Sequence, residues 1–219
     1  MGRFEIDMNT FKRKAQYEYF SSLAYPYMGV TRDIDITELS YSIRQSGAPF
    51  FLTILYCVIK AANSVPELRQ RIIEDKLMQY DSCMASYTVA IDDDTYCYCN
   101  VDCTKPYSEF IEYAKAEQEK AKACNTINCN KAEEEELFFV SSVPWFDYTS
   151  VIQPVPMPAD GNPRLTWGKY FTRCGRTYLP FTILCNHAIV DGRHLGLFFE
   201  ALSDSIREVN ELLSKQIDG

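Results

Sequence analysis

A long hairpin near the C-terminus constrains the fold most strongly. The strand-like segments 164–173 (RLTWGKYFTR) and 176–190 (RTYLPFTILCNHAIV) are separated only by Cys174 and Gly175, and a two-residue connection of this kind joins antiparallel strands. After an Asp-Gly turn, the segment 194–215 places apolar residues at helical spacing along one stripe. A strand pair that runs directly into an amphipathic helix indicates a sheet covered by helices.

The rest of the chain alternates between short strands and helices. Helices are expected over 11–24, capped by Asn9 or Thr10, and over 49–63 and 107–125, which begin near prolines. Strands are expected at 28–37, 76–83, 85–91, 95–101 and 137–143. Because no repeat or linker interrupts this order, we expect one α+β domain over residues 1–219, with helices covering a mixed β-sheet.

Composition excludes several classes of function. The chain has 22 Lys and Arg against 30 Asp and Glu, a formal net charge of −8, which opposes binding to nucleic acid or to an anionic membrane. The segment 1–14 has no apolar run of the length typical of a signal peptide, and the most hydrophobic run, 49–62, is too short for a membrane span. The nine cysteines follow no disulfide framework. We therefore expect a cytoplasmic protein with reduced thiols and a small-molecule or protein partner.

Both histidines of the chain lie in the segment CNHAIVDGRH. His187 ends a predicted strand, and Asp191 stands where it can cap the following helix. The simplest interpretation is a capping aspartate beside a structural histidine. The end of a strand at a tight turn is also a position from which a side chain can act on a substrate.

The segment HAIVDG matches His-x-x-x-Asp-Gly, the signature of the coenzyme-A-dependent acyltransferases, and the chain resembles the chloramphenicol acetyltransferase family. Further segments are similar to that family in the same order: FKRKAQYEYF near the N-terminus, IDIT at 34–37, FFVSSVPW at 138–145, LTWGKY at 165–170 and LPFTILCNHAIVDGRH at 179–194. The resemblance covers essentially the whole chain. It implies the chloramphenicol acetyltransferase-like fold.

The resemblance also implies an activity, the transfer of an acetyl group from acetyl-CoA, as co-substrate and without a metal, to a hydroxyl of chloramphenicol or a related molecule. By resemblance His187 is the general base, Ser141 stabilises the oxyanion and Thr166 holds a water near it. The family implies direct transfer, a cytoplasmic homotrimer with active sites between subunits, and a role in antibiotic resistance.

Further roles follow from the same resemblance. Asp191 is expected to form a mainly structural ion pair with Arg13, and His194 to give local support. Two residues match coenzyme contacts, namely Lys169 and Tyr170. Four residues match the acceptor pocket, namely Tyr19, Phe20, Cys97 and Cys99.

The chain departs from the family at positions that bear on the acceptor. Asn186 stands where the family usually has a first histidine, on the opposite strand face from His187. Cys97 and Cys99 stand where the drug-binding enzymes have a phenylalanine and an alanine, and Pro26 replaces a cysteine. The sequence therefore specifies the chemistry more closely than the acceptor.

Other functions are open on the residues alone. Zinc binding by Cys97, Cys99 and Cys103 lacks the usual two-residue spacings and a second ligand pair. A hydrolase using Cys185 with His187, which share a strand face, lacks a nucleophile elbow. A free-standing dihydrolipoyl-type acyltransferase and a non-catalytic ligand-binding homologue are the alternatives to the acetyltransferase.

Overall fold

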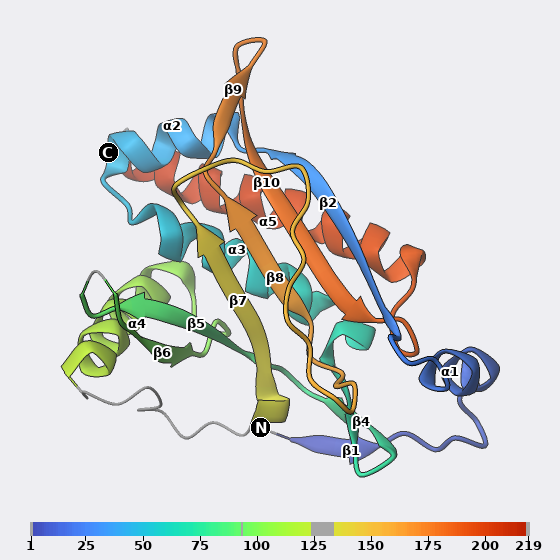
Figure 1. Cartoon of the computed structure of the whole chain (residues 1–219). Helices are drawn as coiled ribbons and strands as arrows, with labels where there is room; N and C mark the ends of the chain where they lie inside the picture. The colour runs from blue at the N-terminus through green and yellow to red at the C-terminus, as the bar shows by residue number, and fades with distance from the viewer. Residues whose placement is uncertain (1, 93, 124–133, 218–219) are drawn as a thin grey trace.

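The computed structural model describes residues 2–92, 94–123 and 134–217. Its centre is a mixed sheet of seven strands, ordered β2-β10-β8-β7-β5-β6, with β9 pairing only with β10 (Figure 1). The strands are β2 (Tyr27–Asp35), β5 (Met84–Ala90), β6 (Tyr96–Val101), β7 (Leu137–Val143), β8 (Arg164–Gly168), β9 (Phe171–Arg173) and β10 (Arg176–Asn186). The expected α+β class with a mixed sheet is confirmed.

The α-helices are α1 (Lys14–Ser21), α2 (Thr37–Ser46), α3 (Phe50–Ser64), α4 (Tyr107–Ala123) and α5 (Gly192–Ile217). All of them except α1 pack on one face of this sheet. Figure 1 shows α3 and α5 lying behind the strands, with α1 apart at the end of β10. A small second sheet is formed by β1 (Arg3–Glu5), β4 (Lys76–Tyr80) and β3 (Gln70–Ile73). Short 3₁₀ helices cover Pro66–Arg69 and Glu134–Glu136.

The core lies between the sheet and α3 and α5. Phe181 of β10 is fully buried and stacks on Phe198 of α5 with ring centroids 5.6 Å apart. The helix α3 is buried on most of its sides because nearly every residue in its middle is apolar. Among the described residues no helix covers the opposite face of the sheet, and the segment 144–163 passes across it (Figure 1). We call this the outer face.

The predicted hairpin is confirmed. Arg173 pairs with Arg176, and the two residues between them, Cys174 and Gly175, have φ angles of 51° and 76°. A two-residue turn with both φ angles positive matches the twist of antiparallel strands. Glycine adopts this conformation without strain, so the sequence specifies the turn locally.

The structure corrects three local expectations near the functional segments. The helix α1 begins at Lys14 with Arg13 as its N-cap, because Asn9 bonds to the Asp7 side chain instead and Thr10 to the Asp7 carbonyl oxygen. The predicted strand 164–173 is broken because the Lys169 amide donates to the Phe146 carbonyl at 2.9 Å rather than to a strand. The strand β10 ends at residue 186, and 187–190 form a turn.

The helix α2 was missed because its sequence, TELSYSIRQS, is largely polar. Asp35 accepts a hydrogen bond from the Thr37 amide at 3.0 Å, and Gly47 follows the helix with a φ of 71°. These are ordinary start and stop signals. Leu39 and Ile43, one turn apart, supply its buried stripe.

No helix in the part of the chain that the structure describes is both long and apolar enough to cross a bilayer.

Candidate active site

His187 is held by the turn that follows β10. Its backbone amide donates to the Pro26 carbonyl at 2.6 Å. Asn186 fixes the turn from both sides, because its Nδ2 donates to the Asp160 carbonyl at 2.9 Å and its Oδ1 accepts from the Ala188 amide at 3.0 Å. An asparagine therefore replaces the family's first histidine with a residue that braces the turn.

The His187 ring is held by a hydrogen bond and by a stacking contact. Its Nδ1 lies 2.8 Å from the Val190 carbonyl oxygen. A carbonyl oxygen can only accept, so the hydrogen sits on Nδ1 and the Nε2 lone pair remains available. Phe20 of α1 stacks on the ring with centroids 3.9 Å apart, and Tyr19 packs edge-on against Phe20. The two α1 residues expected in the acceptor pocket thus lie beside the base.

Asp191 anchors α5 and α1 to this turn. It forms the ion pair with Arg13 that the resemblance implies, and its Oδ1 accepts from the Arg193 amide at 3.0 Å as an N-cap. Burial acts to raise the pKa of Asp191, but His194, Arg13 and the capping bond together hold this pKa below its usual value. His194 is buried, and its Nδ1 lies 3.0 Å from the Asp191 amide nitrogen and 3.1 Å from the Asp191 carboxylate oxygen Oδ1.

Ser141 and Thr166 lie on the outer face and pair directly across β7 and β8. Thr166 pairs in turn with Thr182, whose hydroxyl lies 2.7 Å from that of Thr31. A row of hydroxyls therefore crosses the sheet. Thr166 is almost fully buried, whereas Ser141 is exposed.

A single chain does not bring His187 to Ser141. His187 lies five residues beyond Thr182, and Ser141 lies two strands away from Thr182. With about 3.3 Å per residue and about 4.8 Å between strands, the Cα atoms of His187 and Ser141 are roughly 15–20 Å apart. A general base must reach its proton donor at hydrogen-bond distance, so these two residues of one chain cannot serve the same reacting group.

The outer face holds a cavity of about 840 Å³, which we call the acceptor cavity. Ser141, Thr166 and Gln153 line it together with two tyrosines of β6, Tyr96 and Tyr98. Gln153 belongs to the crossing segment, and its Nε2 donates to the Thr166 hydroxyl. The volume suits a small organic molecule.

The structure does not place Cys97 and Cys99 among the residues that line the acceptor cavity. Both side chains are fully buried on the helix side of β6, and burial raises the pKa of Cys99 to about 11. Successive residues of a strand face opposite sides, so Tyr96 and Tyr98 face the cavity instead. The preference of thiols for the core and the amphipathic nature of tyrosine could have indicated this parity.

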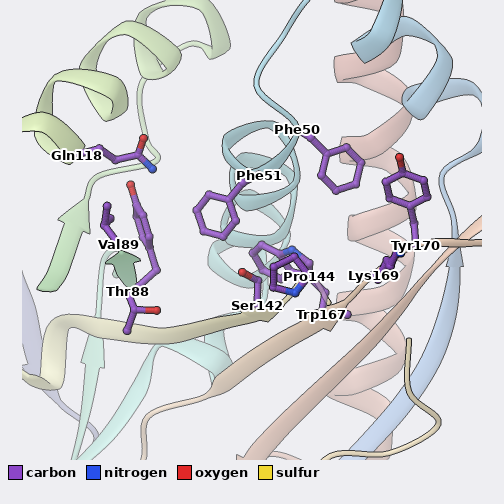
Figure 2. Close-up of a pocket in the computed structure, with 12 residues that line it drawn as sticks. Phe50, Phe51, Thr88, Val89, Gln118, Ser142, Pro144, Trp167, Lys169 and Tyr170 are labelled. Atoms are coloured by element: carbon purple, nitrogen blue, oxygen red, sulfur yellow. The ribbon is translucent and has the colours of Figure 1, made fainter. Parts of the chain in front are cut away.

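A second cavity, of about 390 Å³, lies on the helix side of the sheet, and we call it the coenzyme cavity (Figure 2). Lys169 and Tyr170, the expected coenzyme contacts, both line it, and Tyr170 packs against Phe50 with centroids 5.3 Å apart. Figure 2 shows Phe51 and Trp167 on its inner wall. Sequence reasoning did not identify these aromatic walls, because the residues read equally well as core.

The two cavities share one lining residue next to β7. Thr88 of β5 lines both of them, while the neighbours Ser141 and Ser142 line the acceptor and coenzyme cavities respectively. The β5–β7 ladder ends at the pair of Tyr87 with Val140. Beyond this pair the strands part, so groups can approach Ser141 from both faces of the sheet.

The cysteines of the alternative sites are buried wherever the structure describes them. Burial raises the pKa of Cys185 to about 12, whereas a nucleophilic thiol needs a lowered pKa. Cys103 is buried, and its pKa is also raised by burial. Within residues 2–92, 94–123 and 134–217, no group of three potential metal ligands is found.

Comparison with known proteins agrees with the geometry. The sequence model of the family described as "Chloramphenicol acetyltransferase" matches residues 1–203. A chloramphenicol acetyltransferase of Proteus mirabilis is 29% identical over 208 residues, covering 90% of this chain and 91% of the relative. A Klebsiella enzyme of the same name is 26% identical over 205 residues, covering 92% of each chain.

Solved structures show the same fold. A chloramphenicol acetyltransferase superposes with a TM-score of 0.82 at 24% identity, covering 94% of this chain and all of the other. A dihydrolipoamide acetyltransferase of Azotobacter vinelandii gives a TM-score of 0.67 at 17% identity, covering 96% of this chain and 93% of the other. By the family match over residues 1–203, the chain belongs to the chloramphenicol acetyltransferase family and is an acyltransferase.

Proposed function

We propose that this protein transfers the acetyl group of acetyl-CoA to a hydroxyl of chloramphenicol or a related small acceptor. One observation carries the proposal: two cavities on opposite faces of the sheet adjoin at Thr88, beside Ser141. A thioester entering from the helix side and an alcohol entering from the outer face would meet there. This arrangement supports direct transfer, because both reactants can be bound at once.

The residues have complementary roles in this reaction. His187 would take the hydroxyl proton of the acceptor on Nε2 as the alcohol oxygen bonds to the acetyl carbon. Ser141 would donate its hydroxyl hydrogen to the carbonyl oxygen on which negative charge develops. His187 would then return the proton to the departing sulfur as the carbon–sulfur bond breaks. The proton balance closes with one acetyl ester and one free thiol.

The coenzyme cavity fits its proposed ligand. The pairing of Tyr170 with Phe50 offers flat surfaces for an aromatic base, and Lys169 at the rim supplies a positive charge for phosphate. Acetyl-CoA would supply the activated acyl group. The chain's own residues would orient it and keep its thioester at Ser141.

We also propose that the working form is a homotrimer in the cytoplasm, with each site shared by two subunits. The separation of His187 from Ser141 within one chain supports this, because a neighbouring subunit is then needed to supply the base. Exposed apolar side chains of the crossing segment support it further, namely Trp145, Phe146, Ile152 and Met157. The absence of disulfides among the described cysteines is in keeping with that location.

The test is an assay of thiol release from acetyl-CoA with chloramphenicol and a panel of hydroxylated acceptors. We expect acceptor-dependent thiol release that falls by about 10²–10⁴-fold in His187→Ala. If His187→Ala acetylates as fast as the unmodified protein, the proposed mechanism is wrong. If no acceptor is acetylated, the non-catalytic binding alternative is favoured.

A further inference from the structure

The side chain of Asp160 links its own segment, 144–163, to two strands beside the turn that carries His187. Its two carboxylate oxygens each accept a bond of 2.9 Å from the Arg164 guanidinium of β8, and its Oδ1 also accepts from the Tyr27 hydroxyl of β2 at 2.8 Å. The Asp160 amide donates to the same Tyr27 oxygen at 2.8 Å. Arg164 is almost fully buried, and a two-pronged bond between a guanidinium and a carboxylate fixes both partners.

The backbone carbonyl of Asp160 in turn holds Asn186, the residue before His187. The Asn186 Nδ2 donates to this carbonyl oxygen at 2.9 Å, and its Oδ1 accepts from the Ala188 amide at 3.0 Å. A carbonyl can only accept and an amide can only donate, so these two contacts fix the orientation of the Asn186 carboxamide. The Asn186 carbonyl oxygen also accepts from the next two amides of the turn, at 3.1 and 3.0 Å. Asn186 thus holds three amides of the turn.

The position of the Asp160 carbonyl depends on side-chain bonds. Residues 151–163 belong to no helix or strand, so this carbonyl is not held by a regular backbone ladder. The bonds from the Asp160 carboxylate to Arg164 and Tyr27 supply the missing restraint. Without them, the oxygen that orients Asn186 would be free to shift.

Two routes lead from Asp160 to the His187 ring. The first passes through the turn, whose Val190 carbonyl oxygen lies 2.8 Å from the ring Nδ1. The second passes through Tyr27, because the preceding residue, Pro26, accepts a bond of 2.6 Å from the His187 amide. A displacement of a reacting group by about 1 Å can cost about 10²-fold in rate, so small shifts along either route would be measurable.

Resting on the proposed role of His187 as the base, we infer that Asp160 is a positioning residue for the His187 ring. Asp160 lines neither of the two cavities, so it acts through the residues to which it bonds. Its ion pair and its bond to Tyr27 keep the turn in the geometry that places the ring hydrogen on Nδ1 and leaves Nε2 free to accept a proton. Arg164 also lines the acceptor cavity, so the same carboxylate connects a cavity wall to the base.

The first test observes the ring directly and needs no turnover. The chain contains only two histidines, His187 and His194, so carbon-13 labelling of histidine gives two ring systems in an NMR spectrum. At about pH 8, well above the ordinary pKa of an imidazole, the Cδ2 chemical shift reports which ring nitrogen carries the hydrogen. We expect the Nδ1–H form of His187 in the unmodified protein and a larger Nε2–H fraction in Asp160→Asn and Tyr27→Phe. The His194 signal should stay unchanged.

The second test separates positioning from binding by steady-state kinetics with chloramphenicol. We expect kcat to fall about 10- to 10²-fold in Asp160→Asn and about 3- to 10-fold in Tyr27→Phe. The KM for chloramphenicol should stay within about twofold, because an interaction that matters only in the transition state changes kcat. A raised KM with unchanged kcat would instead mean that Asp160 supports only the cavity wall, and would overturn the inference.

Two further variants guard against a general loss of stability. Asn162→Ala removes a buried side chain of the same segment that donates to the carbonyl oxygens of Glu134 and Leu137. It should lower Tm without changing the ring signal of His187 or kcat. The double variant Asp160→Asn with Arg164→Met leaves no buried charge unpaired, and it should show the altered ring signal even if the single variant folds poorly.

The outcomes separate this inference from the proposed function. An unchanged His187 signal in the folded Asp160 variants overturns the inference, whether or not chloramphenicol is acetylated. An equal change of this signal in Asn162→Ala also overturns it, because any loosening of the segment would then suffice. A His187 signal that depends on Asp160 while no acceptor is acetylated supports the positioning role and refutes the proposed function.

Discussion

Two inactive variants should restore each other's activity when their subunits are mixed. His187→Ala lacks the base but keeps Ser141, and Ser141→Ala lacks the oxyanion donor but keeps His187. Because these residues lie roughly 15–20 Å apart in one chain, a working site must take one residue from each of two subunits. A mixed oligomer then contains some sites with both residues intact.

The recovery can be calculated. In a cyclic trimer that contains both chains, one of the three interfaces joins an intact serine to an intact histidine, so about one third of the sites are complete. Each parent alone should be about 10²- to 10⁴-fold slower for His187→Ala and about 10²- to 10³-fold slower for Ser141→Ala. Recovery to about one third is therefore far above either background.

The assay uses co-expression of the variants with two different affinity tags. Sequential purification isolates oligomers that contain both chains, and thiol release from acetyl-CoA is then measured per subunit. A double variant carrying both substitutions, co-expressed with unmodified chain, is the control for tag effects. If mixed oligomers form and their activity stays at the level of the parents, the site is not shared and the reasoning fails.

The remaining predictions concern stability and the two cavities. Asp191→Asn should lower the free energy of unfolding by about 2 kcal/mol at pH 7, through loss of the Arg13 ion pair and a weakened cap. Because the pKa of Asp191 is lowered in the folded state, this contribution to stability is present above the unfolded-state pKa and is lost as the pH falls through the folded-state pKa. Urea melts of the variant and of the unmodified protein should therefore give converging stabilities in acid. Tyr98→Ala should raise the KM for the acceptor about tenfold by removing part of the cavity wall. Cys99→Ala should leave this KM unchanged and lower the free energy of unfolding by about 1 kcal/mol. Equal effects of the two substitutions on KM would contradict the assignment of Tyr98 to the cavity face of β6 and Cys99 to the core face. Tyr170→Ala should raise the KM for acetyl-CoA about tenfold without changing the KM for the acceptor. Steady-state kinetics with each substrate varied in turn measures both constants, and a raised KM for the acceptor alone would contradict the assignment of the coenzyme cavity.

Local signals in the sequence were sufficient for most elements. The Cys174-Gly175 turn was predictable because its positive φ angles suit that pair of residues. Proline near the starts of α3 and α4 placed those helices within a residue or two. The expectation of one domain over 1–219 stays a prediction.

The candidate site was predictable only in part. Lys169 and Tyr170 could be assigned to a coenzyme site, and Arg13 to an ion pair with Asp191, because the resemblance relates residues that are far apart in the sequence. The resemblance assigned Cys97 and Cys99 of β6 to the acceptor pocket, whereas the preference of thiols for the core indicates that the tyrosines between them face outward. The structure placed the cysteines inside and the tyrosines at the acceptor cavity.

The sequence by itself determined most of the strands and helices, the hairpin turn and the signature at His187, because these depend on residues close together along the chain. Only the tertiary structure decided that Ser141 lies beside Thr166 and far from His187, and that Thr88 lines two cavities. Strand pairing sets these positions, and its register depends on the packing of both sheet faces at once. The same packing placed the Gln153 carboxamide on Thr166, a contact between a connecting segment and a strand that no local pattern specifies.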